Sequence, residues 1–449
     1  MKIALIKPVI GARNGVAYRT PAVLEPLIAG LIATLTPASI EFAFIDERLE
    51  KICFDNQYDL VAVTAETFTA LRSYQIAHEF RSRGVKVLLG GFHPTLLPDE
   101  AAQYADSIAI GAVEAIWPQV IRDLQSGQLK PCYNSRDVVS QPASVNRRIF
   151  AGKGYLPLSL VETGRGCRFN CDFCSVHSFY GDHVVHRPIA QVVTELRSLN
   201  RKQVFFADDN IVSEPEHALN LFRAIKPLGL KWASQASITS AANPTFLDEM
   251  AASGCQAVII GLESLRSGNL RIMNKSWSLN VGEVAKLLAA YRQRGIMVYA
   301  TFVFGYPEDT PEVIRETVDF TINEKLFMAN FNMLYPFPGT PVYEHLAAAG
   351  RLLHQHWWLS SDFRWDFPAF VPEHMTPQEL ADSVKNARKR FSAISSIFRR
   401  GLEFSANLAD PLKALLFLST NLVSRTDISR KNGLRPGLPG YSIAEETAK

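Results

Sequence analysis

The chain has few cysteines, little net charge and no long apolar run. Only six of its 449 residues are cysteine, and nowhere do 18 apolar residues follow one another without interruption. A membrane span is therefore not expected. The 47 basic and 44 acidic residues give a net charge of +3, which offers no global reason to expect a nucleic-acid partner. We expect a cytoplasmic protein, in which cysteines are more often metal ligands or nucleophiles than disulfide partners.

Residues 1–130 alternate short apolar runs with amphipathic helical patterns. This alternation predicts a doubly wound, parallel, Rossmann-like α/β sheet, in which ligands bind at the carboxyl ends of the strands. Gly90 and Gly91 end the fourth predicted strand, where they would also permit a tight turn, and His93 follows it. The predicted strands are 2–7, 40–45, 60–64, 85–91 and 107–111, and the predicted helices are 22–35, 70–83 and 114–126.

A second alternating series occupies residues 156–345, after a proline- and glycine-containing linker at 131–155. Six strand-like runs separated by helical patterns predict a partial (β/α)6 barrel, an incomplete version of the eightfold barrel. In such barrels the chemistry lies where strands end and loops begin. The predicted strands are 157–163, 203–209, 231–237, 257–263, 297–305 and 329–336. The polar residues at their ends include Asp208, Asp209, Gln235, Ser237 and Glu263.

Three of the six cysteines lie on one loop, directly after the first strand of this barrel. Cys167, Cys171 and Cys174 occur within GRGCRFNCDFCSVHSFYG. Thiolates select zinc, copper(I) or iron–sulfur clusters. A structural zinc site needs four ligands, and His177 or His183 could supply the fourth. A four-iron cluster held by three cysteines would keep one iron open to an external ligand. The residues alone leave both alternatives open.

The CxxxCxxC spacing at this place resembles the signature of the radical SAM superfamily. The resemblance implies that the three cysteines bind a [4Fe-4S] cluster whose fourth iron is chelated by S-adenosylmethionine. One electron from the cluster then cleaves the sulfonium to methionine and a 5′-deoxyadenosyl radical. Phe173 fills the aromatic position before the third cysteine and would lie beside the adenine.

The resemblance continues to about residue 345, in the branch that includes bacteriochlorophyll and hopanoid enzymes. FADDN (206–210) and GCQAVIIGLES (254–264) are similar to its second-strand and fourth-strand motifs. The resemblance implies cofactor contacts for Asp208, Asp209 and Glu263, and we expect Gln235 and Ser237 at the same site. The alternatives are helix capping by either aspartate and a barrel salt bridge for Glu263.

The N-terminal part resembles, more loosely, the cobalamin-binding module that precedes the barrel in this branch. GGFHPTLLPDE (90–100) carries the likeness, and Gly90 and Gly91 would let the backbone approach a cofactor tail. The DxHxxG motif that supplies an axial histidine in many cobalamin proteins is missing after the first strand. His93 is a candidate substitute, with a capping or packing histidine as the alternative. We expect cobalamin as a third cofactor.

The C-terminal region, 346–449, is expected to be mainly helical. An aromatic-rich segment at 357–370 would close the open side of the barrel. Residues 385–435 carry eleven basic and three acidic side chains, with an apolar stretch at 412–423. Such a stretch is typical either of a helix packed on its own domain or of a helix resting on a membrane surface.

These features predict a cobalamin-dependent radical SAM C-methyltransferase of a biosynthetic pathway. It would act on a small molecule, apolar or lipid-like because aromatic side chains crowd the end of the barrel, and draw electrons from a donor such as flavodoxin or ferredoxin. One alternative is a cobalamin-independent radical SAM cyclase, rearrangement enzyme or lyase. The other is a non-enzymatic zinc or iron–sulfur binding protein.

Overall fold

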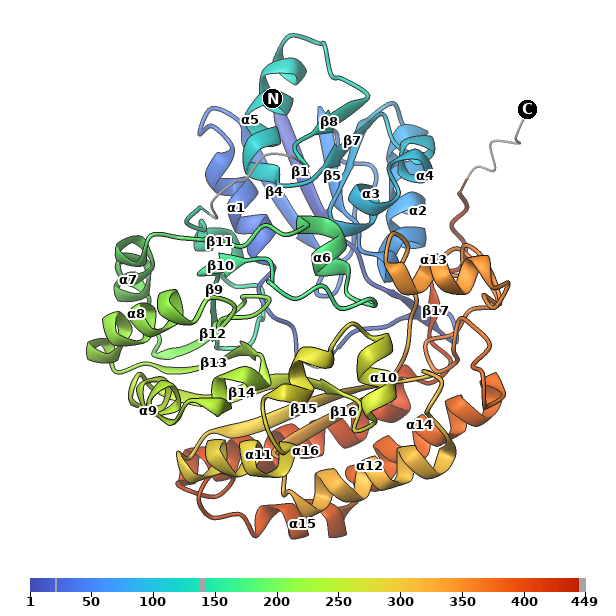
Figure 1. The fold of residues 1–449 in the computed structure, drawn as a ribbon. Coiled ribbons are helices and arrows are strands. Elements are labelled where there is room, and N and C mark those ends of the chain that lie inside the picture. Colours follow the sequence, from blue (N-terminus) through green and yellow to red (C-terminus); the bar gives the residue numbers. More distant parts are fainter. Residues whose placement is uncertain (21, 137–142, 444–449) are drawn as a thin grey trace.

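The computed structural model describes residues 1–20, 22–136 and 143–443. Two six-stranded parallel sheets dominate it, and the first lies above the second in Figure 1. The cysteine loop and helix α6 (Ser175–Tyr180) lie between the two sheets, and the C-terminal helices gather around the lower one (Figure 1).

The first sheet has the strand order β4-β1-β5-β6-β7-β8, and every neighbouring pair is parallel. The order reverses between β1 and β5, which makes their carboxyl ends a topological switch point, where ligands bind in open α/β sheets. The strands are β1 (Lys2–Lys7), β4 (Glu41–Asp46), β5 (Leu60–Thr64), β6 (Lys86–Gly90), β7 (Ser107–Ile110) and β8 (Cys132–Asn134).

Helices cover both faces of this sheet because alternate strand residues are apolar on each side. Leu5, Ala62 and Ala109 face one layer and share a core with it, whereas Ala4 and Ile108 belong to the core on the other face. The first layer holds α1 (Leu27–Leu35) and α5 (Val113–Gln125), and the second holds α2 (Ala70–Arg81) and α4 (Pro98–Tyr104). A short helix, α3 (Phe92–Leu96), follows β6.

The second sheet runs in sequence order, β9-β12-β13-β14-β15-β16, with parallel pairing throughout. This arrangement confirms the predicted partial barrel. Its strands are β9 (Ser159–Val161), β12 (Gln203–Phe206), β13 (Lys231–Ala236), β14 (Cys255–Glu263), β15 (Met297–Phe304) and β16 (Met328–Met333). Its helices include α7 (Ile189–Ser198), α8 (Pro215–Ile225), α9 (Pro244–Ala252), α10 (Ser267–Ile272), α11 (Val284–Gln293) and α12 (Pro311–Asn323).

The C-terminal region is mainly helical, as expected. Helix α14 packs on β16 and α12 at the edge of the barrel, and α15 and α16 follow it beneath the sheet (Figure 1). No helix among the described residues is long and apolar enough to cross a membrane. The helices are α13 (Pro341–Ala348), α14 (Pro377–Phe391), α15 (Ile394–Gly401) and α16 (Pro411–Lys431), and strand β17 (Arg435–Pro436) pairs with β2 (Gly11–Arg13), which also pairs with β3 (Val16–Ala17).

Two segments differ from the expectation. Residues 132–134, inside the expected linker, form the edge strand β8 of the first sheet. The aromatic segment at 357–370 sends Trp357 and Trp358 into the core beneath the first sheet, where Trp358 Nε1 donates to Glu100 Oε1 at 3.0 Å. This segment therefore packs against the first sheet and does not close the open side of the barrel as expected. Helix α14 packs on the edge strand β16 instead. The domain boundaries stay a prediction.

Candidate functional site

A small hairpin holds the base of the cysteine loop. Strand β10 (Gly164–Arg165) pairs antiparallel with β11 (Val185–His186), so the loop leaves and re-enters the structure at one place. Gly166 has φ +82°, and a Cβ there would lie 2.1 Å from the carbonyl oxygen of His183. Only glycine satisfies both conditions, because that φ is strained and that approach is forbidden for other residues.

The three cysteines of this loop line one cavity of about 170 Å³. The cavity lies at the carboxyl ends of the barrel strands, as predicted. Five of the predicted cofactor residues share its lining: Phe173, Asp209, Gln235, Ser237 and Glu263.

Each sulfur of this cavity has a different environment. Burial raises the pKa of Cys171 to about 12, and the nearby Lys275 ammonium acts in the opposite direction. Burial also raises the pKa of Cys174, which caps α6 (Ser175–Tyr180), whereas backbone N–H groups of that helix favour its thiolate. Asn210 Nδ2 lies 3.5 Å from Cys167 Sγ. Positive and N–H groups thus face sulfurs that must lose protons to bind a metal.

The donor set suits an iron–sulfur cluster, because three thiol groups of one short loop line the same cavity. Among the described residues no three His, Cys, Asp or Glu side chains converge on a single-ion site. A structural zinc ion needs four ligand atoms within about 2.3 Å of one point, whereas a four-iron cube spreads its metal atoms over a larger volume. Neither His177 nor His183, the candidate fourth zinc ligands, lines the cavity.

The two predicted aspartates have separate roles. Asp209 lines the cavity, accepts the N–H of Gly166 at 2.9 Å, and has its pKa raised to about 6 by burial. Asp208 lies outside the lining and accepts both the N–H, at 2.7 Å, and the hydroxyl of Thr163. Burial raises the pKa of Asp208 to about 7. Asp208 therefore positions the end of β9, and its predicted cofactor contact has no support in this geometry.

Glu263 ends β14 in an unusual conformation. Its φ is +64°, and the pairing of β14 with β15 is irregular at this point. Such backbone strain in a non-glycine residue is concentrated at functional sites. Burial raises the pKa of Glu263, whereas Lys275 and Thr301, which donates at 3.4 Å, favour the carboxylate. A Cβ on Gly261 would lie 2.0 Å from Glu263 Oε1, so this position leaves room for the carboxylate.

Sequence reasoning missed three members of the cavity lining. Phe169 and Trp277 stack with ring centroids 3.6 Å apart and an interplanar angle of 8°. Lys275 Nζ lies 4.5 Å from the Trp277 ring and is almost fully buried. Lys275 and Trp277 come from the segment after α10, where no strand end or recognised motif marked them. A buried lysine beside a tryptophan is the local signal that could have drawn attention to them.

A second cavity, of about 290 Å³, lies at the switch point of the first sheet. It continues as an apolar slot between one face of the sheet and the layer of α1 and α5. Several of the residues that line it have small side chains, which leave this space open: Ala62, Gly90, Ala109 and Ala112. Its apolar walls are Leu5, Leu27, Leu31, Leu88, Ile116 and Trp117. The slot could accept a flat or apolar arm of a cofactor.

Two of the three residues predicted for this cavity line it. Gly90 and Gly91 do so, and a Cβ on Gly91, whose φ is +118°, would lie 2.7 Å from the carbonyl oxygen of Ala65. His93 is fully buried elsewhere, with Nε2 3.0 Å from Glu100 Oε1 and Nδ1 3.3 Å from Thr67 Oγ1. No histidine is among the described residues that line the cavity. The geometry favours the packing alternative for His93.

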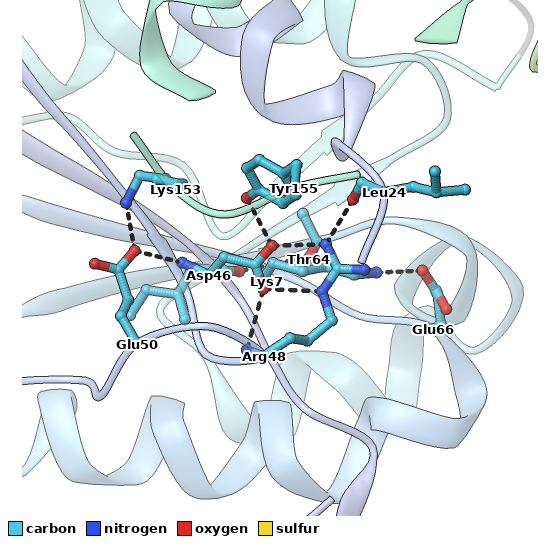
Figure 2. A network of polar contacts seen from close by, with 10 residues as sticks. Lys7, Leu24, Asp46, Arg48, Glu50, Thr64, Glu66, Lys153 and Tyr155 are labelled. Carbon is cyan, nitrogen blue, oxygen red and sulfur yellow. Dashed lines mark hydrogen bonds and ion pairs between the residues drawn. The ribbon is translucent and has the colours of Figure 1, made fainter. Parts of the chain in front are cut away.

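A polar network borders the mouth of this cavity (Figure 2). Lys7 and Glu66, at the ends of β1 and β5, form an ion pair that lowers the pKa of Glu66, and both line the cavity. Beside them the fully buried Asp46 accepts from Arg48 Nη2 at 2.6 Å and from the hydroxyl of Tyr155 at 2.8 Å. Lys7 is the last residue of β1, the strand after which the sequence lacks the DxHxxG motif.

The cysteine loop reaches both cavities. Phe179 and Tyr180, on the helix that Cys174 caps, line the second cavity, and the Phe179 ring lies 4.5 Å from Phe92 of α3. Arg165, two residues before Cys167, donates to Glu114 of α5 at 2.7 Å and to Glu162 at 2.8 Å. One short segment therefore forms part of both sites.

The expected apolar chamber is only partly aromatic. Phe302, Phe304 and Phe331 stack on one another beside Phe391 of α14 and are almost fully buried, so they belong to the core. Alternate residues of these strands, on the opposite face, are partly exposed: Tyr299, Thr301, Val303, Asn330 and Asn332. The exposed face of these strands is more polar than the sequence suggested.

Comparison with known proteins finds a matching family model, which covers most of the barrel. Residues 161–321 match the model of the radical SAM superfamily. These residues therefore resemble a radical SAM domain. A radical SAM domain implies a [4Fe-4S] cluster and S-adenosylmethionine as cofactors of the barrel, and together with the methyltransferase relatives it supports the prediction of an enzyme.

Similarity to individual proteins extends beyond these residues. Bacteriochlorophyllide d C-12(1)-methyltransferase from Chlorobaculum tepidum is 28% identical over 393 residues, which cover 84% of this chain and 85% of the relative. The radical S-adenosylmethionine methyltransferase TsrM from Kitasatospora setae, solved with cobalamin and a [4Fe-4S] cluster bound, has a TM-score of 0.61 and 20% identity and covers 78% of this chain and 75% of its own.

The likeness also includes the first sheet. The cobalamin-dependent S-adenosylmethionine radical enzyme OxsB, solved with aqua-cobalamin bound, has a TM-score of 0.63 at 13% identity. The match covers 95% of this chain and 72% of OxsB. At these identities the two solved structures establish the fold, a Rossmann-like sheet joined to a radical SAM barrel.

Proposed function

We propose that this protein is a cobalamin-dependent radical SAM C-methyltransferase. One observation carries the proposal: the segment 167–180 lines both the thiol cavity and the apolar cavity of the first sheet. A substrate carbon that loses a hydrogen atom to a radical from one cofactor and receives a methyl group from the other must lie within reach of both. The methyltransferase relative and the cobalamin-containing neighbours support the same conclusion.

In this proposal Cys167, Cys171 and Cys174 hold the cluster. When bound, a cluster with one open iron supplies an electron to S-adenosylmethionine, and cobalamin supplies a methyl carrier. Phe173, Gln235 and the stacked pair of Phe169 and Trp277 form the walls of the cofactor cavity.

The charged residues of this cavity orient the cofactor. S-Adenosylmethionine carries an ammonium, a carboxylate and a ribose. Asp209 and Glu263 present carboxylate oxygens to such N–H and O–H donors, Ser237 presents a hydroxyl, and Lys275 offers a cation to the carboxylate. The chain thus provides a partner for each polar group.

The apolar slot would receive the tail of cobalamin. Gly90 and Gly91 line this cavity, and Arg165 and Tyr180 line it from the side of the cysteine loop. No histidine is among the described residues that line this cavity, so none of them would offer an imidazole to the corrinoid. This arrangement replaces the proposed role of His93.

The substrate is a small molecule, and we keep a molecule with an apolar part as the expected class. The partly exposed Tyr299, Asn330 and Asn332 predict that it also carries polar groups. The proposal also includes a flavodoxin or ferredoxin as the electron donor. We place the protein in the cytoplasm, because an iron–sulfur cluster with an open iron requires a reducing compartment.

Anaerobic reconstitution tests the proposal. The protein is loaded with iron, sulfide and hydroxocobalamin, passed through gel filtration and supplied with S-adenosylmethionine and dithionite. We expect about four irons per chain, a retained corrinoid spectrum and formation of 5′-deoxyadenosine. Cofactor cleavage without a retained corrinoid would point to the cobalamin-independent alternative, and one zinc per chain would contradict any radical chemistry.

A further inference from the structure

Helix α16 exposes leucines on its outer face. Helices on protein surfaces usually place polar residues toward solvent, yet six large apolar side chains of α16 are between 40 and 64% exposed. They are Leu412, Leu415, Leu416, Leu418, Leu422 and Val423. A contiguous exposed apolar patch of this kind marks an interaction site.

The opposite face of α16 holds the helix on the barrel through hydrogen bonds and one aromatic contact. Lys413 Nζ donates to the carbonyl oxygen of Gly295 at 2.6 Å, and the Phe417 ring packs on Phe327 in a small core beneath the strands. Asn421 Oδ1 accepts from the buried Arg400 at 2.8 Å. The outward leucines therefore contribute little to this attachment.

Helix α15 and the turn after it continue the exposed apolar surface. Ile394, Phe398, Leu402 and Phe404 are each at least 45% exposed. A cleft of about 490 Å³ separates the start of α15 from the last turns of α16, and Ile394 lines it together with Lys389 and Arg425. Cationic side chains thus lie directly beside the apolar surface.

The charge of this surface is strongly positive. Residues 385–435 contain eleven basic and three acidic side chains, and each acidic one has a partner inside the protein. Asp410 caps α16, Asp427 accepts from the hydroxyl of Tyr18, and Glu403 accepts from Ser405. Within the part of the chain that the structure describes, neither Lys389 nor Arg425 forms an ion pair.

We infer that α15 and the outer face of α16 dock on an anionic membrane surface. Apolar side chains would enter the interface and the flanking cations would contact lipid phosphates. A second copy of the chain fits less well, because a two-fold contact would bring two positive surfaces together. Phe417 and its core lie at the amino ends of β15 and β16, opposite the thiol cavity, so docking leaves that cavity open.

Vesicle flotation of the full-length, reconstituted protein tests this inference. Vesicles of phosphatidylcholine are compared with vesicles in which about one third of the lipid is phosphatidylglycerol. We expect co-flotation with the anionic vesicles, weakened at high salt. The double variants Leu415→Glu/Leu418→Glu and Lys389→Glu/Arg425→Glu should each lower the floated fraction by about tenfold or more.

The control is Val16→Glu, which changes an equally exposed apolar residue on β3, outside this surface. It should float like the wild type, and all variants should still form 5′-deoxyadenosine, so loss of docking is distinct from loss of the proposed function. Equal flotation of the Leu415→Glu/Leu418→Glu variant would overturn the inference, as would no binding to anionic vesicles. So would a dimer that this variant abolishes, because the occupant would then be a second copy.

Discussion

Filling the apolar slot should stabilise the cofactor-free protein and abolish cobalamin binding. Ala109 on β7 lines the slot, and its Cβ lies 3.4 Å from the position that a Cβ on Gly90 would occupy. Ala109→Leu adds three carbon atoms to a space that the protein itself does not fill. Each buried CH₂ contributes about 0.8 kcal/mol, so the free energy of unfolding should rise by up to about 2.4 kcal/mol.

The same substitution on the other face of the sheet serves as the control. Ala4 on β1 is fully buried in a packed core that contains no such cavity. Ala4→Leu should lower the free energy of unfolding by about 1–3 kcal/mol, which is the usual cost of overpacking. It should leave cobalamin retention per folded protein unchanged.

Urea unfolding of the cofactor-free protein and visible spectra after gel filtration with hydroxocobalamin measure the two effects. A more stable Ala109→Leu variant without a corrinoid spectrum would exclude misfolding as the reason for the loss. The reasoning is refuted if this variant is destabilised like Ala4→Leu and still retains the corrinoid, because the slot would then be neither empty nor the binding site.

Three further substitutions test the contacts around the two cavities. Gly261→Ala would place a Cβ against the carboxylate of Glu263, so formation of 5′-deoxyadenosine should fall by about tenfold or more, while thermal unfolding and iron content stay close to wild type. Arg165→Met leaves the buried Glu114 carboxylate without its cation. The free energy of unfolding, measured in urea, should therefore fall by about 3–5 kcal/mol. A second substitution, Glu114→Gln, should restore part of this loss because it removes the unpaired charge. Asp208 has a raised pKa, so it stabilises the fold at low pH and loses this contribution as the pH rises from about 4 to about 7. Relative to Asp208→Asn, the free energy of unfolding of the wild type should therefore decline by up to about 1.4 kcal/mol per pH unit in this window.

Each of these expectations has a clear contrary result. Full activity of Gly261→Ala would show that the Glu263 carboxylate does not orient the cofactor. An unchanged stability of Arg165→Met would show that its ion pairs are screened by solvent. Parallel pH profiles of wild type and Asp208→Asn would mean that Asp208 is already ionised at low pH.

The fold was predictable because buried parallel strands read as continuous apolar runs. Eleven of the twelve strands in the two large sheets lie at the predicted places. The convergence of Asp209, Gln235, Ser237 and Glu263 was predictable too, because parallel strands end at one edge. The exception is β8, an edge strand in which only the middle residue is buried, so it has no apolar run.

The remaining differences have physical reasons. Lys275 and Trp277 reach the cavity from a loop, where no periodicity marks a residue that points inward. Asp208 and Asp209 are neighbours, so their sequence could not show which one Thr163 binds. The stretch 412–423 is apolar on nearly every side, so periodicity could not reveal that the buried face is that of Phe417 and that leucines face solvent.

The central claim is that three cysteines hold a four-iron cluster with one iron open to S-adenosylmethionine. The electron paramagnetic resonance spectrum of the reduced, reconstituted protein before and after addition of this cofactor tests it most directly. The account predicts a cluster signal whose g values shift on addition and which is absent from Cys171→Ala. A cluster signal that S-adenosylmethionine leaves unchanged would contradict it, because every iron would then already carry a protein ligand.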